Sequence, residues 1–174
     1  FKNYIKTLNS SKFPKALTNS IYWVLANAVT QTFFAFLIAL TLNKHFKGVK
    51  IATNWIILSF IIPTVVIVVI WKLMLSSSSG IINSLLVQLH IIDKPIGFFS
   101  SSTSAFISLV LINSWRWSPF LALIILSGLK SIHQEIYDAS KIDGAGFFAE
   151  FFQITLPQLK GVLFVLGLVG TLLS

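Results

Sequence analysis

The acidic and histidine side chains are the groups in this chain that could do acid–base or metal chemistry, and their spacing argues against both. The sequence has five acidic residues, and four lie between positions 135 and 150: Glu135, Asp138, Asp143 and Glu150. The three histidines, His45, His90 and His133, are far apart and lack the short spacing of metal ligands. We therefore expect no metal site and no cofactor.

Nucleophile and phosphate-binding motifs are absent from the sequence as well. There is no G-x-S-x-G elbow, no H-E-x-x-H pair and no G-x-x-x-x-G-K-[ST] loop. The chain also contains no cysteine, which excludes disulfides and thiolate ligands. We expect no catalytic residue, and the chain by itself cannot be a P-loop ATPase.

The segment that holds the acidic residues has helical periodicity. Between residues 130 and 142, apolar residues recur at i, i+4 and i+7, whereas Lys130, Gln134, Asp138 and Lys141 share another face. Residues 143–146 read Asp-Gly-Ala-Gly and should end this helix, because glycine adopts the left-handed conformation at little cost.

A second helix should follow this turn. Its apolar stripe is formed by Phe147, Phe148, Phe151 and Phe152. Thr155 is then expected to cap the next helix, with Pro157 tolerated in its first turn. Residues 127–160 are thus predicted to form helix, tight turn and helix. An alternative is that the segment is an amphipathic surface helix that only connects its neighbours.

The composition on either side of this segment is that of a membrane protein. Hydrophobic residues make up 55% and charged residues 10%, whereas soluble domains carry about 25% charge. The net charge is +8, but the lysines are scattered at the ends of apolar runs. This placement suits lipid headgroups rather than a nucleic acid, which we exclude as a partner.

The apolar runs predict an all-α polytopic bundle. Residues 21–42 would cover about 33 Å, enough for a bilayer core of about 30 Å. Pro63 near the middle of the second run should cause a kink, and a short amphipathic helix is expected at 81–89. The predicted spans are 21–42, 51–75, 103–126 and 161–174 onward. Lysines do not orient these spans, because six fall on each side.

Polar residues inside the runs are candidates for a solute pathway. Asn27, Thr30 and Gln31 share one helical face, which should turn away from lipid. This face could instead join two helices. On the third run, Asn113 and Arg116 are at i, i+3. Arg116 could face a partner or cavity, or could reach the interface near the end of its helix.

The spacing within residues 138–157 resembles the EAA loop, EAA-x3-G-x9-I-x-L-P, of the membrane subunits of ATP-binding-cassette (ABC) importers. Asp143-Gly144-Ala145 is more typical of the carbohydrate-type permeases, and Asp138 and Ser140 depart from the pattern by replacing Glu and Ala. Ile62-Pro63 with Trp71, Gly80 to Asn83, and Trp115 to Phe120 resemble other family segments. The matching loop residues are Asp138, Ala139, Ser140, Asp143, Gly144, Ala145, Ile154, Leu156 and Pro157.

This resemblance implies a permease subunit rather than an enzyme. Its partners would be cytoplasmic ABC ATPase subunits, a second permease subunit, an extracytoplasmic solute-binding protein and the lipid bilayer of the cell membrane, and its solute a sugar or related small molecule. Residues 1–174 would be part of one longer permease domain. A polytopic membrane enzyme is one alternative, but the three substantial apolar runs contain no His, Asp or Glu. A non-transporting membrane scaffold is another.

Overall fold

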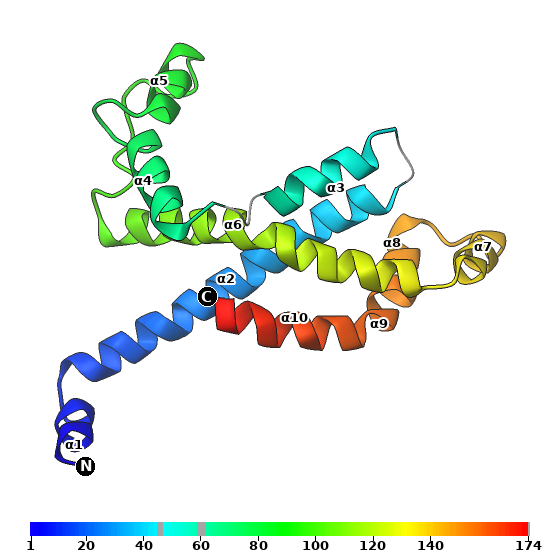
Figure 1. The fold of residues 1–174 in the computed structure, drawn as a ribbon, viewed down its shortest axis with the longest axis horizontal. Coiled ribbons are helices and arrows are strands. Elements are labelled where there is room, and N and C mark those ends of the chain that lie inside the picture. Colours follow the sequence, from blue (N-terminus) through cyan, green and yellow to red (C-terminus); the bar gives the residue numbers. More distant parts are fainter. Residues whose placement is uncertain (45–46, 59–61, 174) are drawn as a thin grey trace.

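The computed structural model describes residues 1–44, 47–58 and 62–173, without the side chains of residues 2, 57 and 58. These described residues form helices and no strand, as the sequence predicts (Figure 1). In chain order the helices are α1 Lys2–Leu8, α2 Lys12–Asn43, α3 Val49–Leu58, α4 Thr64–Met74, α5 Ile81–Gln88, α6 Ser102–Ser131, α7 Gln134–Ile142, α8 Phe147–Glu150, the π-helix η1 Phe151–Thr155, α9 Leu156–Gln158 and α10 Lys160–Leu173.

Two long helices, α2 and α6, form the centre of the molecule, where they run in the same direction and cross each other (Figure 1). Trp23 near the start of α2 contacts Phe106 near the start of α6, with ring centroids 5.9 Å apart. Further along, Asn27 meets Asn113 and Thr30 meets Ser114. Both helices, of 32 and 30 residues, are long and apolar enough to cross a membrane. They contain the predicted spans 21–42 and 103–126, with added turns at their ends.

The parallel arrangement requires the chain to return between α2 and α6. The sequence predicts one kinked span at 51–75, whereas the structure has two separate helices, α3 and α4, and residues 59–61 lie outside the described part. Pro63 stands before α4 in an extended conformation, with ψ of 143°. Proline lacks an amide hydrogen and restricts the residue before it, so it begins α4 instead of bending a continuous helix.

Small side chains allow α2 and α6 to approach closely. Ala35 and Ala39 of α2 are fully buried, as is Ala122 of α6, and Ser118 of α6 is 1% exposed. Where water cannot drive association, small residues let helix backbones meet and gain dispersion contacts. The core is completed by Leu159 and by Leu166 of α10.

The last apolar run enters the bundle at an angle. Residues Phe147–Gln158 and Lys160–Leu173 form a pair bent by 72°. Helix α10 then packs against both α6 and α2. The predicted fourth run is therefore a helix, preceded by a segment that lies across its end (Figure 1).

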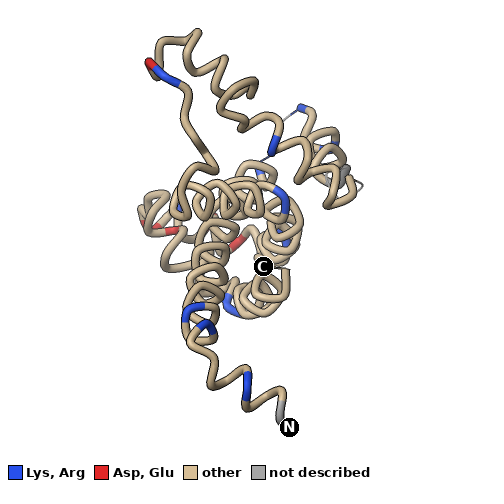
Figure 2. The backbone as a smooth tube through the Cα atoms, turned by 90° about the vertical axis from the view of Figure 1, so that its left-hand side faces the viewer, with Lys and Arg blue, Asp and Glu red and all other residues tan. Residues whose placement is uncertain are grey.

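Large apolar side chains cover the outside of the bundle. Val29 is 70% exposed, Phe33 60% and Val65 74%. Lys and Arg occur in several separate segments rather than in one stripe (Figure 2). This distribution suits a bilayer as the surrounding solvent.

Candidate functional site

The first helix within residues 127–160 is shorter than the helical periodicity of residues 130–142 predicts. Lys130 belongs to the end of α6, Ile132 and His133 are extended, and α7 begins at Gln134. The prediction of one helix from 130 to 142 is therefore wrong in its first turn. Lys130 on α6 and Gln134 on α7 keep an apparent common period although they lie on two consecutive helices, so the pattern could not reveal the break.

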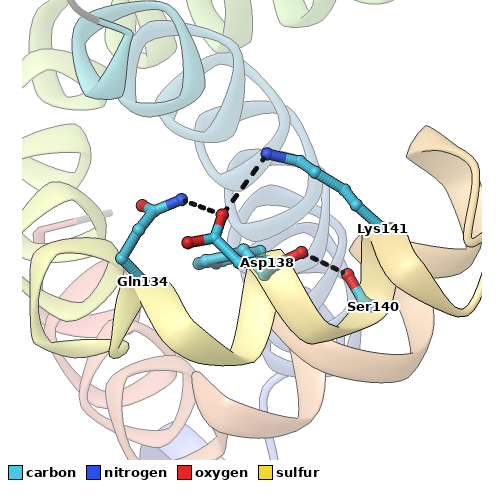
Figure 3. A network of polar contacts seen from close by, with 5 residues as sticks. Gln134, Asp138, Ser140 and Lys141 are labelled. Carbon is cyan, nitrogen blue, oxygen red and sulfur yellow. Dashed lines mark hydrogen bonds and ion pairs between the residues drawn. The ribbon is translucent and has the colours of Figure 1, made fainter.

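The polar face of α7 is open to solvent. Gln134 Nε2 donates to Asp138 Oδ1 at 3.2 Å, and Lys141 Nζ lies 3.9 Å from the same oxygen (Figure 3). The Asp138 and Lys141 side chains are 61% and 62% exposed. An exposed pair of this kind contributes little to stability. The carboxylate of Asp138 is consequently free to meet a charge on another molecule.

Gly144 ends α7 in the way the sequence predicts. Its φ is +79°, the left-handed region. The amides of Asp143, Gly144 and Ala145 donate to the carbonyls of Ala139, Lys141 and Ser140, so they satisfy the last turn of the helix. A Cβ at Gly144 would meet no atom within 4 Å, so the need for glycine there is conformational rather than steric.

The second half of the segment remains helical through Thr155. The predicted cap at Thr155 is wrong: this residue has helical φ and ψ, and its side chain caps no amide. The π-helix η1 continues directly into α9, so there is no free first turn for Thr155 to cap. Pro157 does lie in the first turn of α9, as predicted. Ile154 and Leu156 are half-buried beside it.

Sequence reasoning did not single out Tyr137. Its hydroxyl lies 3.2 Å from Thr155 Oγ1 and so joins α7 to η1. One turn later Ser140, which is 6% exposed, donates to the Tyr137 carbonyl. Two polar residues at i, i+3 were the signal in the sequence, but the partner of the Tyr137 hydroxyl, Thr155, lies eighteen residues away.

The polar residues predicted within the spans meet at the interface between α2 and α6. Asn113 Nδ2 donates to Asn27 Oδ1 at 2.8 Å, and Gln31 Nε2 donates to the same oxygen at 3.3 Å. The hydroxyls of Thr30 and Ser114 are 2.6 Å apart. Asn27 and Gln31 are fully buried, whereas Thr30 and Asn113 are partly exposed.

Comparison with known proteins places this arrangement in a family. Residues 31–171 match the family described as "binding-protein-dependent transport system inner membrane component". The chain belongs to this family. Its membrane location agrees with the two long apolar helices and with the exposed apolar surface.

Named relatives of this inner membrane component are transport permeases. The trehalose/maltose transport system permease protein MalF of Thermococcus litoralis is 31% identical over 171 residues, or 98% of this chain and 57% of the relative. The inner membrane ABC transporter permease protein YcjO of Escherichia coli is 30% identical over 162 residues, or 92% of this chain and 55% of the relative. The chain thus spans little more than half the length of these relatives.

A solved structure has the same fold. A bacterial ABC transporter involved in the import of the acidic polysaccharide alginate matches with a TM-score of 0.83 at 22% identity, over 98% of this chain and 59% of that one. The all-α permease fold predicted from the sequence is confirmed.

Arg116 of this inner membrane component lies over an aromatic ring. Its Cζ is 5.0 Å from the centre of the Trp117 ring, and its side chain is partly exposed. Within the described residues, Arg116 has no carboxylate partner. The interaction that the structure shows for this guanidinium is therefore a cation–π contact with the ring of the next residue.

Two of the three histidines considered as metal ligands lie within the described residues. His133 precedes α7 and His90 follows α5, while His45 lies outside the described residues. Among the residues that the structure describes, no three His, Asp or Glu side chains are grouped to hold a metal ion.

Proposed function

We propose that this chain is part of the permease subunit of an ABC importer and that residues 127–160 couple it to a cytoplasmic ATPase. The observation that carries the proposal is α7: a short helix outside the bundle core, closed by Gly144, with an exposed face that includes Asp138. A helix ended by a defined turn transmits a displacement, whereas a flexible loop would absorb it.

Binding and hydrolysis of ATP on the partner would move α7, and α2, α6 and α10 would follow as packed helices. The end of the molecule that holds α7 would then be cytoplasmic. Two of the similar proteins indicate the kind of solute. One belongs to a trehalose/maltose transport system, and the other is a transporter involved in the import of alginate. We therefore propose a saccharide as solute. A second permease subunit and an extracytoplasmic binding protein would complete the importer.

The coupling role is tested by changing Gly144 to valine in the full-length permease. A β-branched residue resists the positive φ of 79° at this position. Gly144→Val should leave membrane insertion intact, weaken co-purification of the ATPase and reduce uptake of trehalose or maltose at least tenfold. Gly144→Asn should retain more activity, because asparagine tolerates the left-handed region.

Gly146 supplies the matched control. It is two residues away, and a Cβ there also meets nothing within 4 Å, but its φ is −80°. Gly146→Val should therefore keep most of the uptake and ATPase association, although valine in place of glycine at this N-cap costs about 1 kcal/mol of local stability. Equal effects of the two substitutions would show that added bulk, and not the turn, matters. Normal uptake and ATPase association in Gly144→Val would refute the coupling role.

A further inference from the structure

The hydrogen bond between Tyr137 and Thr155 has a direction that the structure fixes. Thr155 Oγ1 lies 3.3 Å from the Glu150 carbonyl and 3.2 Å from the Tyr137 hydroxyl. A threonine hydroxyl has one hydrogen, and a carbonyl can only accept. Thr155 must donate to Glu150, and Tyr137 must donate to Thr155. These two hydrogen bonds form a relay from Tyr137 on α7, through Thr155, to the carbonyl of Glu150 at the end of α8.

The receiving end of this relay is firmly held by the bundle. The ring of Phe151, the first residue of η1, packs edge to face on Phe36 of α2 with centroids 5.8 Å apart. Leu159 is 1% exposed and touches α6 beside Gly128, where an added Cβ would lie 2.7 Å from its Cδ2. The segment after the turn is therefore fixed to both long helices.

The donating end is held much less. Extended residues separate α7 from α6, and Gly144 separates it from α8. Ile142 at the end of α7 is 87% exposed. Within the described part of the chain, the Tyr137 hydroxyl forms the side-chain hydrogen bond that joins α7 to the segment after the turn.

We propose that Tyr137 and Thr155 form a latch that positions α7 on η1 and delivers its movement to α10. A π-helix is a wide, uncommon turn that often marks a functional position, and η1 leads through α9 into α10. A cavity of about 250 Å³ lies beside the pair and is lined by Asn43, Lys44, Lys141 and Glu150. Without its hydrogen bond, the Tyr137 ring has room to move there. This inference rests on the proposed function, the coupling of α7 to an ATPase.

Tyr137→Phe and Thr155→Val each remove one hydroxyl and keep the shape of the side chain. They test the latch in the full-length permease, purified with its ATPase subunits in phosphatidylethanolamine–phosphatidylglycerol vesicles. We expect amide hydrogen exchange of residues 134–142 to rise about two- to tenfold, the range for one neutral hydrogen bond. Thr155→Val also removes the hydrogen bond to the Glu150 carbonyl. The double variant should therefore match Thr155→Val, because the bond between Tyr137 and Thr155 is already lost there. Thr155→Ser should keep the amide hydrogen exchange of the unaltered protein, because serine retains the hydroxyl.

Transmission to α10 is measured with a thiol reporter. Because residues 1–174 contain no cysteine, Lys160→Cys, at the exposed polar start of α10, can be followed by maleimide labelling at that position, with and without magnesium-ATP. We expect ATP to change the labelling rate. Tyr137→Phe and Thr155→Val should each reduce that change about two- to tenfold, while the ATPase still co-purifies. Tyr22→Phe and Thr18→Val, exposed positions on α2, serve as matched controls.

The outcomes separate the latch from the proposed function. If the ATPase binds and both variants keep the full ATP response at residue 160, the latch is refuted and the coupling role stands. If the reporter shows no ATP response in the unaltered protein, delivery to α10 is refuted. If no ATPase co-purifies, the coupling role fails. In that case, unchanged amide hydrogen exchange of residues 134–142 in the variants refutes the latch. Faster exchange means that the latch still positions α7 on η1.

Discussion

At the scale of single residues, Asp138 tests whether α7 meets a charged partner. Its side chain is mostly exposed, and its partners among the described residues are Gln134 and Lys141 on its own helix. Asp138→Asn keeps the shape and the acceptor oxygen but removes the charge. If Asp138 pairs with a basic residue of the ATPase, Asn should lower the rate of coupled uptake severalfold, whereas Glu should retain most of it. A desolvated interfacial charge pair loses about 2–5 kcal/mol when one partner is truncated, and a rim pair loses far less.

The same substitution separates coupling from folding. An exposed pair stabilises the chain little, so the melting temperature of Asp138→Asn should equal that of the unaltered permease. Lys141→Gln is a control that leaves the carboxylate in place. Unaltered uptake in Asp138→Asn would show that this charge takes no part in coupling.

At the scale of helices, Gly128 sets the distance between α6 and the segment that leads into α10. An added Cβ would lie 2.7 Å from Leu159 Cδ2 and 2.7 Å from Val162 Cγ2. Both neighbours are confined, because Leu159 is buried and valine is stiff at χ1. Gly128→Ala should therefore destabilise the full-length permease by about 1–3 kcal/mol from overpacking, less up to about 1 kcal/mol gained in helix propensity.

Gly167 provides the opposite expectation on α10. A Cβ there meets nothing within 4 Å, so Gly167→Ala should raise stability by about 0.5–1 kcal/mol. Thermal unfolding in detergent, followed by the loss of tryptophan fluorescence, compares the two variants. A Gly128→Ala protein as stable as Gly167→Ala would mean that α6 and α10 can separate without cost.

At the scale of the whole molecule, the polar residues between α2 and α6 decide whether a solute path borders this interface. Asn27 and Gln31 are fully buried, which favours their role in joining helices, while Thr30, Asn113 and Arg116 are partly exposed and remain candidates for the path. We expect Thr30→Cys and Asn113→Cys to react with a membrane-impermeant thiol reagent, at rates that change with ATP.

Two kinds of position serve as controls for this thiol labelling. Gln31→Cys should be protected inside the interface, and Val29→Cys, which is 70% exposed on the outer surface, should be shielded by lipid. If Thr30→Cys and Asn113→Cys react no faster than Val29→Cys, the polar cluster only holds α2 to α6. Each interhelical hydrogen bond would then stabilise the pair by about 0.6 kcal/mol, the average found within membranes.

The sequence alone determined the features that depend on neighbouring residues. The apolar runs, the short helix predicted at 81–89 and found at 81–88, and the end of α7 at Gly144 all follow from local periodicity and from the conformational freedom of one glycine. The spacing of residues 138–157 also indicated the family before any contact was known. These features are local because a helix satisfies its hydrogen bonds within a few residues.

Tertiary structure decided the features that join distant residues. Asn27 and Asn113 are 86 positions apart, and only the parallel packing of α2 on α6 brings them together. The same packing buried Gln31, and the approach of α7 to η1 gave Tyr137 its partner. Thr155 does not begin a helix, because η1 runs directly into α9. A sequence pattern shows which side of a helix is polar. Which helix that side faces depends on three-dimensional packing, because many pairings satisfy the same pattern.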